Sequence, residues 1–381
     1  MSKRLLIITR HRLNENNGGA NGSKGFIRCF AELFDDCSII YPEFDNPAAY
    51  IPLKYKLIPC HDSRSKIRKG LDCYRGVLSP LASFSKTHLS DHKYDIIVID
   101  HSFIATGLIK TIKQTGAKII TIHHNVESDY LNDNRQQFSL SFRIPYIYYA
   151  KKAERDCLQR SDINLTVTEK DALKFKTWYK DIHIYNWGNF EYKPIPPKTF
   201  TARERNMTFI ITGSLCFIQS LQPILEFIHK YWPIATSLYP DAKLIIAGRE
   251  PSSSLLQACE KIKSIAVIPN PKDISSLVQQ ASYYVCPINA GSGRKLRVLD
   301  GLKQGLPVLC HLISMSGYEC MADNHCMFTY HDEQSFEVSL KKILASNASA
   351  EFIYQTYSTN FSIKAGVEKL RMILKQEALL P

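Results

Sequence analysis

The chain has 381 residues, a formal net charge of +12, and contents of 45% hydrophobic and 22% charged residues. This length predicts about two domains, and the composition is that of a globular protein in water. No apolar run approaches the roughly 18 residues of a membrane span. The 11 cysteines are scattered without metal-ligand spacing, and no export signal precedes them, so we expect reduced thiols in a cytoplasm.

The positive charge predicts an anionic partner. The chain has no nucleic-acid motif and no basic stripe interleaved with aromatic residues, which argues against nucleic acid. Residues 66–69 (Lys-Ile-Arg-Lys), with Arg64, Arg75 and Lys86 nearby, form a basic stretch. It is either a solvated surface segment or a contact for the anionic headgroups of a membrane.

The first half alternates buried strands with helices, the pattern of a parallel α/β domain. Strands are predicted at 3–9, 37–41, 94–100, 118–122, 163–168 and 182–187, and helices at 26–34, 66–84, 103–115, 138–160 and 169–178. Residues 10–25 form a polar loop in which Gly18 and Gly19 would let a ligand approach the backbone closely. A plain flexible loop is the alternative, and the loop lacks the G-x-G-x-x-G dinucleotide fingerprint.

Polar side chains follow two of these strands. Asp100 and His101 end one of them, and His124 and Glu127 follow the next. Because ligands of open α/β sheets gather at the carboxyl ends of the strands, these four groups predict a polar site. A single histidine in such a place is more often structural.

A proline-rich polar segment at 189–206 predicts a linker between domain 1–188 and domain 207–360. A second alternation follows, and an amphipathic helix at 361–381 ends the chain. In this half, strands are predicted at 208–212, 243–247, 265–269, 283–286, 307–312 and 327–330, and helices at 221–239, 252–263, 273–281 and 334–345.

The rest of the chain is organised around the stretch from Cys286 to Asp300. Its Gly291-Ser292-Gly293 loop is predicted to open a helix that Ser292 caps, and such an N-terminus is a ready anion site. Arg294 and Lys295, with Arg297, would crowd the first turn, where a diphosphate would offset their repulsion with the helix dipole. Asp300 would accept hydrogen bonds from sugar hydroxyls. An ordinary turn with a solvated basic end is the alternative.

Four features of the second half together resemble the C-terminal domain of family 4 glycosyltransferases of the GT-B fold. They are the strand and turn Phe209-Ile-Ile-Thr-Gly213-Ser214, the stretch from Pro240 to Arg249, the helix 273–281, and the segment from Gly291 to Val308. The last is similar to the family pattern G-G-G-T-R-L-K-I-L-E-A-M-A-M-G-x-P-V. The first half matches more loosely, at the N-terminal glycine loop, at 124–127 and at 167–171.

The resemblance implies two Rossmann-like domains facing across a cleft, with the C-terminal helix crossing back to the first. It implies transfer of a sugar from a nucleotide-sugar to a saccharide or lipid-linked acceptor, with retention of configuration, in bacterial surface polysaccharide or glycoconjugate synthesis. The implied catalytic residues are His124, Lys295 and Asp300. The donor would contact Gly213, Ser214, Arg249, Gly291, Ser292, Gly293, Arg294, Lys295 and Asp300, and the acceptor side would hold Gly18, Gly19, His101 and Glu127.

No D-x-D triplet occurs in the chain, so we expect neither a bound metal nor a cofactor besides the donor. The enzyme would transfer a hexosyl or N-acetylhexosaminyl group at the cytoplasmic face of the membrane. Two departures from the family bear on this activity. Ser292 and Asp300 stand where many members have two glutamates. Lys295 and Arg249 would replace an Arg and a Lys that are absent after the strand at 208–212.

Two further hypotheses remain open from the sequence. One is a nucleotide-sugar epimerase or hydrolase on the same fold. The other, motivated by Ser292 and Asp300, is a non-catalytic subunit that binds a sugar nucleotide. The sequence names neither the donor sugar nor the acceptor, and it leaves the oligomeric state undetermined.

Overall fold

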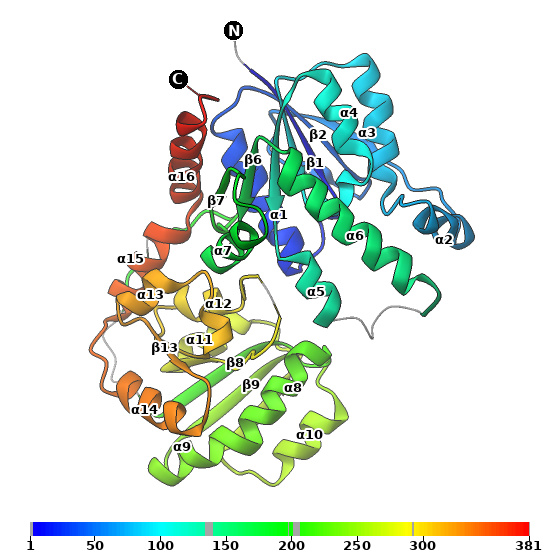
Figure 1. The fold of residues 1–381 in the computed structure, drawn as a ribbon. Helices are drawn as coiled ribbons and strands as arrows, with labels where there is room; N and C mark the ends of the chain where they lie inside the picture. The colour runs from blue at the N-terminus through cyan, green and yellow to red at the C-terminus, as the bar shows by residue number, and fades with distance from the viewer. Residues whose placement is uncertain (1–2, 134–139, 197, 201–205, 292, 381) are drawn as a thin grey trace. The chain divides into compact units, whose positions relative to one another are not determined.

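The computed structural model describes residues 3–133, 140–196, 198–200, 206–291 and 293–380. The chain divides into two compact units. The first comprises Met1–Pro194, Gly291–Gly293 and Phe361–Pro381, and the second comprises Ile195–Ala290 and Arg294–Asn360. Each unit has its own parallel sheet (Figure 1), so the predicted class of two Rossmann-like α/β domains is confirmed.

The first unit is built on a seven-stranded sheet with the order β3-β2-β1-β4-β5-β6-β7, and all neighbouring strands run parallel. Its strands are β1 (Arg4–Thr9), β2 (Asp36–Pro42), β3 (Tyr55–Cys60), β4 (Ile96–Asp100), β5 (Lys118–His123), β6 (Ile163–Thr166) and β7 (Ile184–Asn186). Its helices are α1 (Gly18–Ala31), α2 (Lys66–Tyr74), α3 (Pro80–Asp91), α4 (Leu108–Thr115), α5 (Glu127–Asp133), α6 (Leu140–Arg160), α7 (Glu169–Trp178) and α16 (Ile363–Gln376), with short 3-10 turns η1 (Pro47–Ala49) and η2 (Ser102–Ala105).

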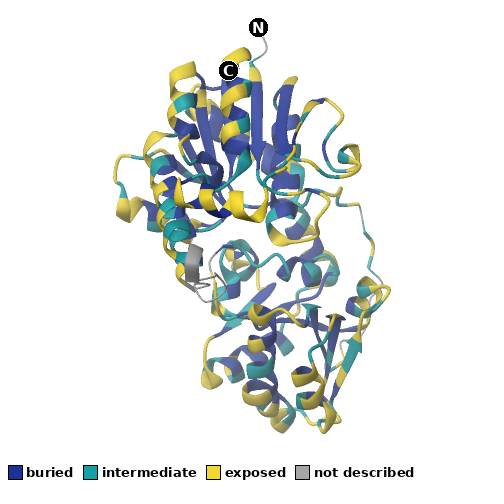
Figure 2. Cartoon of the chain, turned by 90° about the vertical axis from the view of Figure 1, so that its right-hand side faces the viewer, coloured by how far each residue is buried: buried dark blue, intermediate teal, exposed yellow. Residues whose placement is uncertain are grey.

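Both faces of this sheet are buried, because alternate residues of each strand point to opposite sides. Leu5 and Ile7 of β1 join the apolar cluster that contains residues of α1 and α16. Leu6 and Ile8 of the same strand join the cluster that contains residues of α3 and α4. Figure 2 shows these strands almost wholly buried. Each such side chain contributes roughly 1.5–3 kcal/mol relative to an exposed one.

The second unit has a six-stranded parallel sheet with the order β10-β9-β8-β11-β12-β13. Its strands are β8 (Thr208–Ser214), β9 (Lys243–Arg249), β10 (Ile265–Pro269), β11 (Tyr283–Cys286), β12 (Val308–His311) and β13 (Met327–Tyr330). Its helices are α8 (Ile218–Glu226), α9 (Trp232–Leu238), α10 (Ser253–Glu260), α11 (Ile274–Gln280), α12 (Val298–Leu302), α13 (Glu319–Asp323), α14 (Glu333–Leu344) and α15 (Ala350–Phe361), with a π-helical turn η4 (Phe227–Tyr231) and a 3-10 turn η5 (Leu312–Met315).

Glycines break two predicted helices. The helix expected at 66–84 is two helices, α2 and α3, because Gly76 has φ +77° and Pro80 begins the second. The helix expected at 103–115 is a 3-10 turn and α4, separated by Gly107 with φ +70°. Strand β3 and helices α5, α13 and α15 were not expected. No described helix is both long enough and apolar enough to cross a membrane.

The N-terminal glycine stretch is also helical, which corrects the predicted loop at 10–25. Helix α1 begins at Gly18, after Asn17 accepts a hydrogen bond from the Ala20 amide at 2.9 Å. A Cβ at Gly19 would lie 2.4 Å from the His11 ring, and one at Gly25 would lie 2.4 Å from the Phe190 carbonyl oxygen. These glycines therefore let α1 pack closely against its neighbours, instead of opening a loop to a ligand.

Candidate functional site

The order of strands reverses once in each sheet, between β1 and β4 in the first unit and between β8 and β11 in the second. Ligands of open parallel sheets bind outside the carboxyl ends of the strands at such a point. In both units these ends carry polar side chains. They are therefore the candidate sites.

In the first unit, a buried carboxylate holds one histidine in place. Asp100, at the end of β4, accepts hydrogen bonds from His124 Nε2 at 2.6 Å and from the Thr9 hydroxyl at 2.6 Å. Burial acts to raise the pKa of Asp100, but the charge and hydrogen bond of His124 outweigh it and keep that pKa below its usual range. Asp100 is therefore ionised, and His124 carries a proton on Nε2, which leaves Nδ1 as its other polar atom.

A second histidine and carboxylate lie beside this pair. His101 Nδ1 accepts a hydrogen bond from the Phe103 amide at 3.4 Å, and His101 Nε2 lies 3.0 Å from Glu127 Oε1 and 3.4 Å from Arg10 Nη1. Burial lowers the pKa of His101 well below 6.5 and raises that of Glu127. The rings of His101 and His124 are 5.5 Å apart. The structure therefore brings together the four polar groups predicted from the two strand ends.

Sequence reasoning missed His11, which follows β1. Its ring centroid lies 5.2 Å from that of His124 and 5.7 Å from that of His101, and its Nε2 is buried without a hydrogen-bond partner among the described residues. Burial and the nearby His124 lower the pKa of His11 well below 6.5. The order of strands could have indicated His11, because His11 follows β1 and β1 is the strand next to β4. We call the group of His11, Asp100, His101, His124 and Glu127 the histidine cluster.

Glu154 of α6 was missed as well. It is 1% exposed, and its carboxylate accepts hydrogen bonds from the amides of Glu127 and Ser128, at 2.6 and 3.3 Å, and from the Ser128 hydroxyl. It thereby caps the first turn of α5, which carries Glu127. Burial raises its pKa to about 7 despite these hydrogen bonds.

A cavity of about 500 Å³ opens beside the histidine cluster, entirely within the first unit. Its lining includes Arg10 and His11 after β1, Glu43 after β2, and His61 and Asp62 after β3. Carboxylates and imidazoles are partners for sugar hydroxyls, and guanidinium groups are partners for phosphates. None of the predicted acceptor-side residues Gly18, Gly19, His101 and Glu127 lines this cavity.

In the second unit, two glycines bring the ends of β8 and β9 together. A Cβ at Gly248 would lie 1.8 Å from the carbonyl oxygen of Gly213, so only glycine fits there. Gly213 has φ +140°, and a Cβ on it would lie 2.4 Å from the guanidinium of Arg297. Arg297 therefore rests on the end of β8.

Arg297 is the cation that the structure adds to the predicted donor set. Its Nη2 donates to the Ser220 hydroxyl at 2.9 Å, whereas its Nη1 is buried with no hydrogen-bond partner in the described part of the chain. A buried guanidinium nitrogen without a partner is costly, and an anion would satisfy it. The sequence placed Arg297 only among the cations near the glycine loop.

The predicted helix opening at 291–293 is wrong. Gly291 and Gly293 have φ +86° and +69°, and α12, with five residues, begins only at Val298. Its N-cap residue makes no side-chain cap, and Ser292 lies outside the described residues. Arg294 and Lys295 therefore precede the helix, and so short a helix has little dipole to offer an anion.

Tyr318 explains this local structure. The guanidinium of Arg294 lies 4.1 Å from the centre of the Tyr318 ring, and the Tyr318 hydroxyl donates to the Lys295 carbonyl oxygen at 3.0 Å. The chain is thus held in a non-helical turn through these two residues. Arg294 stacks on an aromatic face, a common arrangement for a guanidinium.

Three other predicted donor residues lie near the ends of β8 and β9. Asp300 is half-buried and accepts a hydrogen bond from Thr212 of β8 at 3.2 Å. Ser214 ends β8 and is half-buried, and Arg249 ends β9 and is exposed. The two residues pair in the register of these strands. The second unit therefore gathers Gly213, Ser214, Arg249 and Asp300 around the end of β8. No group of three or more His, Cys, Asp or Glu residues in the described ranges is arranged to hold a metal ion.

Comparison with known proteins bears on both units. Residues 207–346, which include all six strands of the second sheet, match the family model described as glycosyl transferases group 1. The chain is also 23% identical over 304 residues to an uncharacterized 44.6 kDa protein in the cps region of Klebsiella pneumoniae, covering 74% of this chain and 76% of that protein. The family match supports a glycosyltransferase.

Solved structures resemble the chain over nearly its full length. Alr3699/HepE of Anabaena in complex with UDP has a TM-score of 0.66 at 12% identity and covers 98% of this chain and 100% of its own. TarM of S. aureus has a TM-score of 0.67 at 10% identity and covers 97% of this chain and 98% of its own. A glycosyltransferase of Rickettsia africae has a TM-score of 0.64 at 12% sequence identity, with 99% of both chains covered. These similarities identify the fold as GT-B.

Proposed function

We propose that the protein is a glycosyltransferase that moves a sugar from a nucleotide-sugar to a saccharide or lipid-linked acceptor in the synthesis of surface polysaccharide or a glycoconjugate. The observation that carries this proposal is the family match over residues 207–346. The relative encoded in a cps region supports the pathway. We place the reaction at the cytoplasmic face of the membrane.

We propose a uridine diphosphate sugar as the donor, supported by the solved neighbours that hold UDP or UDP-glucose. The diphosphate would lie at the end of β8, where Arg297 Nη1 has a hydrogen to donate. Lys295 would supply a second positive charge. Asp300, which accepts a hydrogen bond from Thr212, would also accept from the hydroxyls of the ribose.

The acceptor would bind in the first unit, in the cavity beside the histidine cluster. The acceptor would extend from this cavity, which His11 lines, to His124, whose Nδ1 would meet a sugar hydroxyl because Asp100 fixes Nε2. Such positioning of reacting groups lowers the barrier without a chemical step by the histidine itself. His101 and Glu127 would support the His124 ring from the side.

We propose a retaining reaction that needs no metal. The bond between the anomeric carbon and the diphosphate oxygen breaks while the acceptor oxygen bonds to the same carbon on the same face. The leaving phosphate takes the proton of the acceptor hydroxyl, so no dedicated base is required. Arg297 and Lys295 neutralise the charge that develops on the diphosphate, and such stabilisation is worth several kcal/mol where water is excluded.

Calorimetric titration with UDP tests the donor site. We expect binding, and we expect Arg297→Ala and Lys295→Ala each to weaken it by about 1–3 kcal/mol, the cost of losing a charged hydrogen bond. Arg371→Ala, on the exposed side of α16, is the matched control and should leave affinity unchanged. Absence of binding by UDP and by other nucleoside diphosphates at millimolar concentration would contradict the proposal.

Product analysis separates transfer from the other chemistries. A panel of nucleotide-sugars is incubated with and without acceptor saccharides, and the sugar is followed by NMR. A transferase consumes donor in step with a new glycosidic linkage. Conversion or hydrolysis of the donor at full rate without acceptor would instead assign an epimerase or a hydrolase.

A further inference from the structure

Helix α2 exposes an apolar row that ordinary surface helices bury. Ile67, Leu71 and Tyr74 are 78%, 51% and 55% exposed. They are four and three residues apart, so they share one face of the helix. A helix of a globular protein normally turns such a face toward the core, and this one turns it to solvent.

Cations surround this row. Lys66, Arg68, Lys69 and Arg75 are all exposed. Residues 62–75 contain five Lys or Arg and two Asp, which gives this short segment a net charge of +3. An exposed apolar row flanked by lysines and arginines is the composition of helices that lie in the interface of a membrane.

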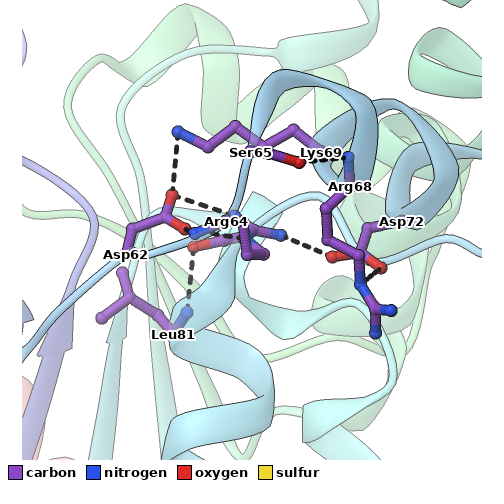
Figure 3. Close-up of polar contacts among 8 residues, drawn as sticks. Asp62, Arg64, Ser65, Arg68, Lys69, Asp72 and Leu81 are labelled. Atoms are coloured by element: carbon purple, nitrogen blue, oxygen red, sulfur yellow. Dashed lines mark hydrogen bonds and ion pairs between the residues drawn. The ribbon is translucent and has the colours of Figure 1, made fainter.

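Ion pairs on the other side of α2 hold the helix in this orientation (Figure 3). Arg64 contacts Asp62 at 2.8 Å and Asp72 at 3.1 Å, and Lys69 contacts Asp62 at 3.2 Å. Arg68 also contacts Asp72, at 3.1 Å, and Asp72 is buried. Hydrogen bonds from Arg64 lower the pKa of Asp62 to about 2, so this carboxylate stays ionised.

Helix α6, which packs against α2, also exposes apolar side chains. Ile144 and Tyr148 of α6 are four residues apart and are 79% and 61% exposed. A cavity of about 340 Å³ lies at this junction, with Lys66 and Lys69 among its basic residues and Val77, Leu78 and Tyr146 among its apolar ones. A charged headgroup and the start of an acyl chain would meet complementary groups there.

We propose that the exposed residues of α2, with Ile144 and Tyr148 of α6, form a surface that docks on an anionic lipid bilayer. The apolar row enters the boundary between headgroups and acyl chains, and Lys66 and Arg75 bind the headgroup phosphates. Charge complementarity favours a membrane over a protein partner, because the cores of protein interfaces are depleted in lysine. The docking is independent of the donor chemistry proposed above.

Sedimentation of the full chain with vesicles tests this surface. We expect binding to vesicles containing phosphatidylglycerol, weak binding to pure phosphatidylcholine, and loss of binding as salt is raised. Ile67→Ser with Leu71→Ser, and separately Lys66→Glu with Arg75→Glu, should each weaken binding more than about tenfold. Because all four side chains are exposed, the variants should keep the unfolding midpoint of the unmodified chain.

Matched controls change equally exposed residues elsewhere. Val338→Ser with Met372→Ser removes two exposed apolar side chains, and Lys364→Glu with Lys375→Glu reverses two exposed charges. Both controls should bind vesicles as the unmodified chain does. If the α2 variants bind as tightly as the controls, or if the unmodified chain ignores anionic vesicles, the membrane assignment is overturned and a protein is the occupant to test next. UDP titration of the same variants shows whether the donor site is intact, so the two proposals fail separately.

Discussion

One residue of the histidine cluster has a backbone conformation that side chains rarely adopt. His101 has φ +96° and ψ +121°, and such a conformation costs about 1–3 kcal/mol in a residue other than glycine. Its amide donates to the Ile122 carbonyl oxygen at 3.2 Å, and its ring is held by Glu127. Strain that the surrounding contacts maintain is typical of functional sites. It supports a role for the cluster beyond packing.

Replacing the carboxylate that orients His124 tests this role. Asp100→Asn keeps the shape of the side chain and can still accept from His124, but it removes the charge that fixes the ring. We expect kcat to fall by roughly tenfold to a hundredfold, the cost of misplacing a positioning group. The affinity for UDP should stay the same, because Lys295, Arg297 and Asp300 lie on the other unit. Kinetics with saturating donor and acceptor measure the first effect, and titration measures the second.

Asp36→Asn is the matched control for this substitution. Asp36 is an exposed aspartate at the start of β2. Its substitution should leave kcat and UDP affinity unchanged. If Asp100→Asn lowers the unfolding midpoint but spares kcat, the carboxylate is structural and the positioning role is wrong.

At the scale of elements, glycines set how closely helices approach. The Trp187 indole donates to the Gly366 carbonyl oxygen at 2.9 Å, which anchors α16 to the first unit. A Cβ at Gly366 would lie 2.6 Å from Cys29 Sγ on α1 and 2.7 Å from the Phe190 ring. The helix can come this near only without a side chain at position 366.

Gly366→Ala should therefore destabilise the first unit. Alanine normally favours a helix by about 1 kcal/mol over glycine, but overpacking costs about 1–3 kcal/mol, so we expect a net loss. Gly18→Ala is the control, because Gly18 lies in the first turn of α1 and a Cβ added there would have no neighbouring atom within 4 Å. Urea unfolding should show a lower midpoint for Gly366→Ala alone. Equal midpoints for the two variants would contradict the packing argument.

These elements also show what the sequence can predict. Runs such as Ile96–Ile99 and Leu5–Ile8 are apolar throughout, so both sheets and the position of Asp100, His101 and His124 at strand ends were predictable. Helix boundaries set by glycine were not. Gly18 to Gly25 looked like a loop because glycine is a poor helix former, whereas the structure uses it for contact between α1 and its neighbours. Such a use depends on which segments meet, and the local sequence does not contain that information.

The donor site shows the same limit of prediction from the local sequence. The segment after Cys286 was predicted from its glycines and cations, and it does lie at the reversal of the second sheet. The helix expected there is absent, because Tyr318 holds Arg294 and the Lys295 carbonyl oxygen in a turn. The contact of Arg297 with Gly213 joins residues 84 positions apart. A search for a motif of consecutive residues cannot find this contact.

At the scale of the whole molecule, one buried carboxyl group should contribute to the pH dependence of stability with a sign that can be worked out. Glu154 has an ordinary pKa of 4.5, and burial raises it to about 7 in the folded chain. Between these values the folded chain keeps a proton that the unfolded chain has lost. The contribution of Glu154 to the free energy of unfolding must therefore fall as pH rises from about 4.5 to 7. The gap corresponds to about 3 kcal/mol as an order of magnitude.

Glu154→Gln removes this titration, because glutamine stays neutral while its oxygen can still accept from the α5 amides. We expect urea unfolding between pH 5 and pH 7.5 to show that the stability of the unmodified chain, relative to that of this variant, falls as pH rises. Glu260→Gln, on the exposed side of α10, should keep the slope of the unmodified chain. The comparison uses slopes, so any constant loss from the weaker cap of α5 cancels. Parallel curves for the unmodified chain and Glu154→Gln would mean that Glu154 is ionised throughout, held by the amides and hydroxyl that it accepts from.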